Sequence, residues 1–269
     1  MTEWDAADYA RISALQKVMA DEVLALVELK GSERVLDVGC GDGKITVEIA
    51  ARVPCGSVVG IDPSAKMIAF ATSHWADTHS NMRFEVADAR LLPFREEFDH
   101  VASFNALHWI PEQEEALISI FSSIKSGGMA QLRLVPKGER KSLEDVLEET
   151  RQSPSWGQYF REFHDPYLHL TPQEYAGLAE KVGFTVLSLN VGSRAWDFQS
   201  RSGFFAFGWV TFVEWTRMLP KPRSLPLSMM SWTVIDSSPE TRRRSSSTRW
   251  IYDWSEAEAR ECAQGEEGV

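Results

Sequence analysis

The sequence is poor in cysteine and in positive charge, and it contains no long apolar run. Its three cysteines, Cys40, Cys55 and Cys262, have neither the number nor the spacing of a disulfide framework or a metal site. The 28 Lys and Arg residues against 39 Asp and Glu residues give a net charge of −11, which argues against nucleic acid as the main partner. No apolar stretch has the length of a membrane-spanning helix, so we expect no membrane partner.

The N-terminus also lacks the features of a secretory leader. Residues 1–5 contain no basic segment followed by an apolar one. Together with the few cysteines, this predicts a soluble protein of the reducing cytoplasm. The 269 residues are enough for one large domain with a tail, and the apolar fraction of 43% is typical of a globular protein. The sequence predicts no particular oligomeric state.

What the sequence does contain is a short apolar segment, residues 35–38, that runs into a turn with glycine at every second position. The glycines are Gly39, Gly41 and Gly43, and residues 44–50 then have helical spacing. A strand, a glycine turn and a helix form the first half of a βαβ unit. Glycine lets a ligand approach the backbone where a Cβ would obstruct it, so we expect a ligand at this turn.

The spacing of the glycines indicates which ligand binds there. A dinucleotide site has the pattern G-x-G-x-x-G, whereas this turn reads D-x-G-x-G-x-G and begins at Asp37. Asp42 also stands in the turn, although a pyrophosphate would favour a helix N-terminus free of negative charge. An acid at Asp37 therefore suits a cationic ligand better. An ordinary βα unit with a chance glycine turn is the alternative, because a glycine pattern alone is a weak signal.

This turn resembles the first motif of the class I S-adenosylmethionine-dependent methyltransferases. The fold that the resemblance implies is an α/β, Rossmann-like, doubly wound sheet, mostly parallel and seven-stranded, with an N-terminal helical cap. The cofactor that it implies is S-adenosyl-L-methionine. In this sequence the residues of the motif, which are thereby candidates for cofactor binding, are Asp37, Gly39, Cys40, Gly41 and Gly43.

Three further strands are predicted at residues 57–62, 82–88 and 98–105, and each ends at a polar side chain. Asp62 stands roughly 20 positions after Gly43, close to the interval at which an acid contacts a ribose; the alternative is a plain turn residue. Open α/β sheets bind ligands beyond the carboxyl ends of their strands, so we expect these ends to form one site. The resemblance implies further cofactor contacts there, from Asp62, Pro63, Asp88, Ala89 and Asn105.

Two other segments indicate which branch of these methyltransferases the sequence resembles. Trp4 and Tyr9 lie in the predicted helical cap, residues 1–30, and His108 and Trp109 follow the fourth predicted strand in the sequence Leu-His-Trp-Ile. With a Gly-Ile-Asp-x-Ser second motif, these features are similar to trans-aconitate 2-methyltransferases, which esterify a small polycarboxylate. The resemblance makes these four residues candidates for substrate binding, and core packing is the alternative for Tyr9.

Two later segments offer further candidates for the substrate site. Arg133, near the end of the predicted strand 129–135, is a candidate partner for an acidic substrate, with a surface ion pair as the alternative. Residues 198–215 are rich in aromatic side chains. Such a segment lines a pocket or, more commonly, packs in the core. The small-molecule acceptor is the partner that the resemblance implies, and no metal site is expected.

The expected chemistry is an in-line displacement of a methyl group from a sulfonium. A carboxylate acceptor is ionised at pH 7 and needs no general base, so catalysis depends on alignment and on exclusion of water. A hydroxyl, amine or carbon acceptor more often needs a base, for which His108 is the candidate. A structural histidine beside Trp109 is the alternative. A regulatory protein that binds the cofactor without catalysis, and an oxidoreductase that the glycine spacing disfavours, are the competing classes.

The remaining organisation is a cofactor-binding domain over residues 31–220 and an atypical tail over residues 221–269. The tail loses apolar periodicity and contains three arginines and three serines at residues 242–247. It offers only residues 250–252 for a seventh strand, which the fold requires antiparallel beside residues 129–135. Plausible codons of two tail segments, read one base out of phase, encode a better patterned helix and strand. We therefore expect a tail that is disordered or frame-shifted.

Overall fold

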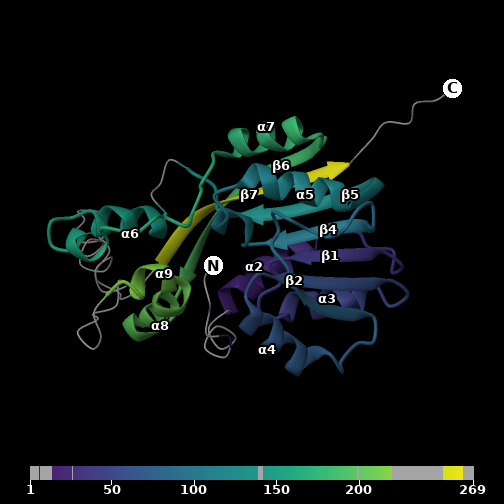
Figure 1. Ribbon diagram of the computed structural model, residues 1–269, viewed down its shortest axis with the longest axis horizontal. Coiled ribbons are helices and arrows are strands. Elements are labelled where there is room, and N and C mark those ends of the chain that lie inside the picture. The colour runs from purple at the N-terminus through teal and green to yellow at the C-terminus, as the bar shows by residue number, and fades with distance from the viewer. Residues whose placement is uncertain are drawn as a thin grey trace.

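The computed structural model describes residues 6, 14–25, 27–138, 142–198, 200–219 and 251–262. A twisted central sheet is covered by helices on both faces (Figure 1). The strands are β1 (Arg34–Val38), β2 (Ser57–Asp62), β3 (Met82–Val86), β4 (Phe98–Phe104), β5 (Ile124–Leu134), β6 (Val186–Asp197) and β7 (Ile251–Cys262). The α-helices are α2 (Ala14–Leu24), α3 (Lys44–Arg52), α4 (Ala65–Trp75), α5 (Gln113–Ser123), α6 (Leu143–Arg151), α7 (Pro172–Val182), α8 (Arg201–Thr211) and α9 (Val213–Thr216). Short 3-10 helices lie at Leu107–Trp109 and Gly157–Tyr159.

The strand order is β3-β2-β1-β4-β5-β7-β6, with β1 to β5 parallel and β7 antiparallel to both of its neighbours. The order reverses between β1 and β4, where Leu36 of β1 lies between Val59 of β2 and Val101 of β4. The doubly wound, Rossmann-like prediction is confirmed. Such a reversal opens a crevice at the carboxyl ends of the strands, which is where ligands bind in this class of fold.

The seventh strand differs from the prediction. It runs from Ile251 to Cys262 rather than over residues 250–252 alone, and its last part, Ala257–Cys262, pairs with β5. The edge of β5 is therefore covered, and an unpaired β5 no longer supports the frame-shift hypothesis for the tail. Residues 220–250 and 263–269 lie outside the described part of the chain.

Of the predicted helical cap, residues 1–30, the structure describes residue 6, residues 14–25 and residues 27–30. Among the described residues its helix is α2, which ends at Leu24. The chain then turns because the carboxylate of Glu33 accepts hydrogen bonds from the backbone N–H groups of Lys30, Gly31 and Ser32, with N···O distances of 2.6, 2.9 and 3.1 Å. The candidates Trp4 and Tyr9 lie outside the described residues.

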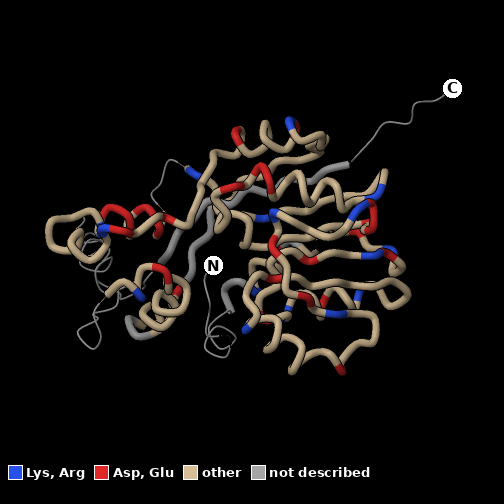
Figure 2. The backbone as a smooth tube through the Cα atoms, viewed as in Figure 1, with Lys and Arg blue, Asp and Glu red and all other residues tan. Residues whose placement is uncertain are grey.

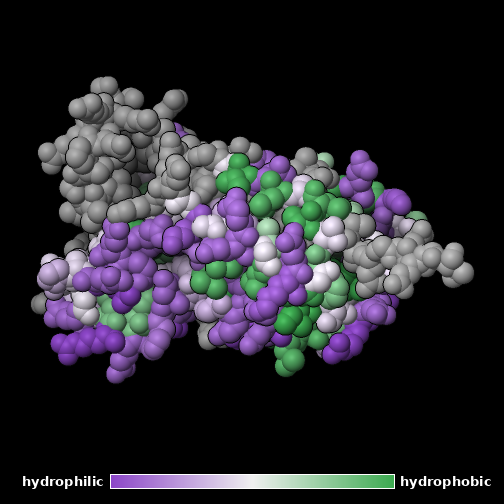
Figure 3. Space-filling model, turned by 90° about the horizontal axis from the view of Figure 1, so that it is seen from above, coloured by the Kyte–Doolittle hydropathy of each residue, from purple (hydrophilic) through white to green (hydrophobic). Residues whose placement is uncertain are grey.

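Charge and hydropathy are unevenly distributed over the surface. Acidic residues concentrate on α6, at the end of the molecule that also carries α8 and α9 (Figure 2). Hydrophilic and hydrophobic residues are interspersed on the face seen from above (Figure 3). Among the described helices, none combines the length and the apolar character that crossing a bilayer requires.

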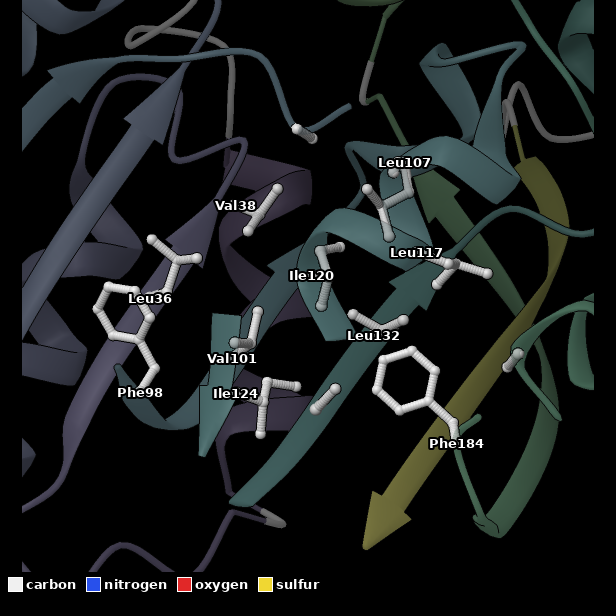
Figure 4. Packing of buried hydrophobic residues seen from close by; sticks show 14 of the residues in the cluster. Leu36, Val38, Phe98, Val101, Leu107, Leu117, Ile120, Ile124, Leu132 and Phe184 are labelled. Carbon is white, nitrogen blue, oxygen red and sulfur yellow. The ribbon is translucent and has the colours of Figure 1, made fainter. Parts of the chain in front are cut away.

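The main core lies between the sheet and α5. Leu117 and Ile120 of α5 face Val101 and Leu132 of the central strands, and all four side chains are buried (Figure 4). A second buried cluster is largely aromatic and joins α6, α8 and α9. It contains Phe207, Phe212 and Trp215, so the aromatic segment 198–215 packs mainly in this core. The two cores hold the carboxyl ends of the strands against the outer helices.

Candidate active site

A cavity of about 550 Å³ lies where the strand order reverses, beyond the carboxyl ends of β1 to β4. The helices α6, α8 and α9 lie beyond the same end of the sheet and close the cavity on the outside (Figure 1). Of the candidate residues, those that line it are Gly39, Gly41, Asp62, Pro63, Asp88, Ala89, Asn105, His108 and Trp109. The structure thus brings the polar strand ends together, as the sequence predicted.

The glycine turn adopts a conformation that only glycine takes readily. Gly39, Gly41 and Gly43 have φ angles of +77°, +53° and +82°. The backbone N–H groups of Gly39 and Cys40 donate to the carbonyl of Ile61, with N···O distances of 2.8 and 2.9 Å, which ties the turn to β2. Gly39 and Gly41 face the cavity. Gly43 instead caps α3, where a Cβ would lie 2.9 Å from the Cβ of Ala71.

Asp62 ends β2 with its carboxylate held in a fixed orientation. One oxygen, Oδ2, accepts from the backbone N–H of Gly41 at 3.1 Å, and Oδ1 accepts from the backbone N–H of Ser64 at 2.8 Å. Ser64 in turn caps α4 by accepting from the N–H of Met67. A carboxylate fixed at the wall of a cavity, opposite a glycine turn, is suited to accept the hydroxyl hydrogens of a ribose.

Asp37 and Cys40 lie behind the wall of the cavity rather than on it. The carboxylate of Asp37 is 2% exposed and accepts from Oγ1 of Thr46 at 2.7 Å. Burial, and then the charge of Asp62, raise the pKa of Asp37 to about 7, although the Thr46 bond opposes the rise. Burial likewise raises the pKa of the Cys40 thiol. Asp37, Cys40 and Gly43 are therefore not among the residues that line the cavity, and their contact with the cofactor stays a prediction.

The raised pKa of Asp37 predicts a pH-dependent affinity for a cationic ligand. Below pH 7 the carboxyl holds a proton, and the site then presents less negative charge. We expect S-adenosylmethionine to bind more weakly at pH 6 than at pH 8, by at most about tenfold, because about a tenth of Asp37 is ionised at the lower pH. Calorimetry in two buffers of different ionisation enthalpy should detect the proton released on binding. An Asp37→Asn variant with the same pH dependence as the wild type would contradict the assignment.

Asp88 is held by a neighbouring cation. Its two carboxylate oxygens accept from the backbone N–H, Nε and Nη2 of Arg90, with N···O distances of 2.6 to 3.1 Å. Arg90 also donates to Glu112 at 2.9 Å, and the side-chain bonds from Arg90 lower the pKa of Asp88. The carboxylate is thus ionised and oriented at the cavity wall. Adenine recognition by Asp88 and Ala89 stays a proposal, with Arg90 as the residue that orients the acid.

His108 and Trp109 form the junction between the inner and outer parts of the cavity. His108 is 4% exposed, and its Nδ1 lies 3.5 Å from the backbone N–H of Val135, which donates to it. Burial, the neighbouring His169 and the charge of Arg133 keep the pKa of His108 well below its usual range. The imidazole is neutral at pH 7. Arg133 itself is buried and does not line the cavity, and its contact with a substrate stays a prediction.

The outer wall of the cavity was missed by sequence reasoning. Apart from Met19 of α2, it comes from segments that follow β5. The ring of Tyr167 packs against Trp109 with the centroids 4.0 Å apart. The backbone N–H of Leu168 donates to the carbonyl of His108 at 3.0 Å and fastens this loop. The only signal in the sequence was the aromatic segment 198–215. The residues of the outer wall are Met19, Glu144, His164, Asp165, Pro166, Tyr167, Phe207, Thr211, Phe212, Glu214 and Arg217.

These residues fit S-adenosylmethionine. The glycine turn leaves space for a ligand beside the backbone, Asp62 is oriented for the ribose, and the described residues contain no group of acids, histidines and cysteines suited to a metal ion. The fold and the cavity define an α/β protein that binds a nucleoside-containing ligand at the switch point of its sheet.

Known proteins support a closer assignment. Residues 35–128 match the family described as a methyltransferase domain. The chain is 26% identical over 204 residues to the putative methyltransferase 235L of Invertebrate iridescent virus 6. The matched residues make up 76% of this chain and 75% of the relative. The chain is 33% identical over 135 residues to the trans-aconitate 2-methyltransferase of Variovorax paradoxus, and this match covers about half of each chain. It is 30% identical over 161 residues to the juvenile hormone acid O-methyltransferase of Bombyx mori, and this match covers 58% of each chain.

Solved structures share the fold. A putative methyltransferase of Bacillus halodurans superposes with a TM-score of 0.65 at 18% identity, over 90% of this chain and 97% of that one. The phosphoethanolamine N-methyltransferase 2 of Haemonchus contortus, solved with S-adenosyl-L-methionine, superposes with a TM-score of 0.62 at 17% identity, over 97% of this chain and 57% of that one. Residues 35–128 are thus a methyltransferase domain on a fold shared with solved methyltransferases, and S-adenosyl-L-methionine is the cofactor that this family uses.

Proposed function

We propose that the enzyme methylates a carboxylate oxygen of a small acid that has an apolar body. The observation that carries this proposal is the neutral, buried His108 at the entrance to an aromatic chamber. Around His108, the rings of Trp109, Tyr167, Phe207 and Phe212 line the outer part of the cavity. An apolar body gains free energy by leaving water for such a surface.

The proposed acceptor differs from the polycarboxylate that the sequence suggested. The arginines among the described lining residues are Arg90 and Arg217, and each is paired with an acid. Glu144 and Asp165 also line the outer wall and disfavour a second carboxylate there. The trans-aconitate and juvenile hormone acid enzymes are both named for an acid that they methylate. Their shared chemistry supports a carboxyl acceptor, and the aromatic chamber favours an acid with one carboxylate.

A carboxylate acceptor makes the chemistry simple for the protein. When bound, S-adenosylmethionine supplies an electrophilic methyl group, and transfer forms one C–O bond as one C–S bond breaks, with no proton transferred. Asp62 and the glycine turn hold the ligand, and the outer wall of Tyr167, Phe207 and Phe212 excludes water and aligns the acceptor. A histidine as weakly basic as His108 is a poor general base, and this reaction does not require one.

The role of His108 is tested by a His108→Asn substitution, which retains an N–H donor and removes the titratable ring. We expect kcat to stay within about tenfold of the wild type and to show no pKa in the histidine range. Loss of a general base costs roughly a hundredfold or more. A loss of that size in a folded variant would instead indicate a hydroxyl or amine acceptor.

The acceptor class is tested with matched compounds that share one apolar body. Their end groups are a carboxylate, a hydroxyl and an amine, and trans-aconitate is a fourth substrate. We expect methyl transfer to the carboxylate compound above all, and a methyl ester as the product. Transfer to the hydroxyl or amine compound alone would contradict a carboxyl acceptor, and a strong preference for trans-aconitate would contradict the apolar body.

A further inference from the structure

Asn105 has an unusual backbone and lies at the centre of the cavity wall. It follows β4 with a φ of +57°, a left-handed conformation that asparagine tolerates better than most residues. Two contacts with Arg133 of β5 hold it there. The backbone N–H of Asn105 donates to the carbonyl of Arg133 at 2.9 Å, and Nη1 of Arg133 donates to Oδ1 of Asn105 at 3.0 Å.

The chemistry of the guanidinium determines which way the Asn105 amide points. A guanidinium has five N–H donors and no acceptor, so the amide atom that it meets is the oxygen. Arg133 is 1% exposed and stands behind the wall, whereas Asn105 lines the cavity. The NH₂ group is therefore the part of the amide left for a ligand. At Asn105 the cavity wall therefore presents a hydrogen-bond donor to a ligand rather than an acceptor.

Arg133 also places a positive charge behind this part of the cavity wall. Its charge is one of the causes that lower the pKa of His108, so its field reaches the cavity wall. A cation behind a polarised N–H donor favours an anionic oxygen as the ligand. A carboxylate has such oxygens and needs only donors to bind.

We infer that Arg133 is a positioning residue that fixes the Asn105 amide as a hydrogen-bond donor for a carboxylate. The carboxylate belongs either to the acceptor, in which case the inference rests on the proposed function, or to the amino-acid part of the cofactor. Arg133 acts through Asn105 rather than by direct contact with a ligand. Asn105 is thus the residue that binds the carboxylate, and Arg133 is the residue that orients Asn105.

An Asn105→Asp variant tests the donor most directly. Aspartate keeps an oxygen for Arg133 and replaces the NH₂ donor by a second oxygen. Binding of the carboxylate should weaken roughly tenfold to a hundredfold, the range for a hydrogen bond to a charged group. An Asn105→Gly variant, which keeps the left-handed backbone without the amide, should weaken it as well. Arg133→Lys, which retains one donor and the charge, should stay nearer to the wild type than Arg133→Met.

Two measurements distinguish the source of the carboxylate. Calorimetry compares S-adenosylhomocysteine, which has the amino-acid carboxylate, with 5′-methylthioadenosine, which lacks it. Kinetics gives KM and kcat for the apolar acid. Weaker binding of S-adenosylhomocysteine alone supports the donor and assigns it to the cofactor, whereas a higher KM for the acid with kcat nearly unchanged assigns it to the acceptor. If folded Asn105→Asp changes neither, the inference is overturned. An absence of any acid methylation by the wild type contradicts the proposed function, and the calorimetry still tests the donor.

Discussion

A Gly39→Ala variant should lose tight binding of S-adenosylmethionine and several kcal/mol of stability. A Cβ at this position would lie 2.2 Å from the Cβ of Ala106, and the residue has a φ of +77°. The left-handed backbone alone costs alanine roughly 1–2 kcal/mol. The clash costs more, because Ala106 can move only with Asn105 and Leu107, which line the cavity. Chemical denaturation measures the stability, and calorimetry measures the dissociation constant.

The chain contains a matched control for this substitution. Gly127 also has a φ of +77°, but a Cβ there would have no atom within 4 Å. Gly127→Ala should therefore cost roughly 1–2 kcal/mol for the backbone conformation alone and leave cofactor binding unchanged. If the two variants have equal stability and equal affinity, close approach of the turn to the Asn105 segment does not shape the site.

Replacing Asp62 by alanine should weaken S-adenosylmethionine binding by about 1.5–3 kcal/mol, or roughly tenfold to a hundredfold in the dissociation constant. The carboxylate is oriented by the backbone N–H groups of Gly41 and Ser64, and its removal takes away the proposed ribose contacts. It also releases the glycine turn from its bond to Asp62. The two losses act on the same ligand and in the same direction.

Asp99→Ala is the control for the loss of a carboxylate in general. Asp99 lies near the start of β4, at the opposite end of the sheet, and pairs with Lys125 at 2.7 Å. This variant should cost some stability and leave cofactor affinity as in the wild type. If Asp62→Ala in folded protein also binds with wild-type affinity, Asp62 does not contact the cofactor.

The inner half of the site could be predicted from the sequence because its signals are local. A short apolar segment before the glycine turn, and acids at Asp62 and Asp88 after apolar strands, are patterns of neighbouring residues. The parallel fold then brings the strand ends together without further information. Asn105, His108 and Trp109 were candidates through the family resemblance of the segment that follows the fourth strand.

The layer behind the wall could not be predicted in this way. Asp37 lies two positions before the first glycine in sequence, yet its side chain accepts from Thr46 of α3 and stays buried. Arg133 was expected to meet a substrate because arginine commonly binds acids. The register of β5 against β4 instead places Arg133 beside Phe104, where it reaches Asn105. Which side of a wall a residue occupies depends on contacts between distant segments.

The outer half of the cavity depends on distant segments as well. The loop carrying Tyr167 is fastened to His108, nearly sixty positions earlier in the chain, and α8 and α9 come later still. The seventh strand could not be predicted for the same reason. Residues Ala257–Cys262 contain no β-branched or aromatic side chain that would predict a strand, and they form one by pairing between β5 and β6.

The central claim is that this methyltransferase transfers its methyl group to a carboxylate. The most direct measurement uses S-adenosylmethionine with an isotope-labelled methyl group and the carboxylic acid of the matched series, followed by mass spectrometry of the product. We expect one labelled methyl group per product molecule, and release of labelled methanol on mild alkaline hydrolysis, as an ester requires. A labelled product that survives alkaline hydrolysis, with the methyl group on nitrogen, carbon or an ether oxygen, would contradict it.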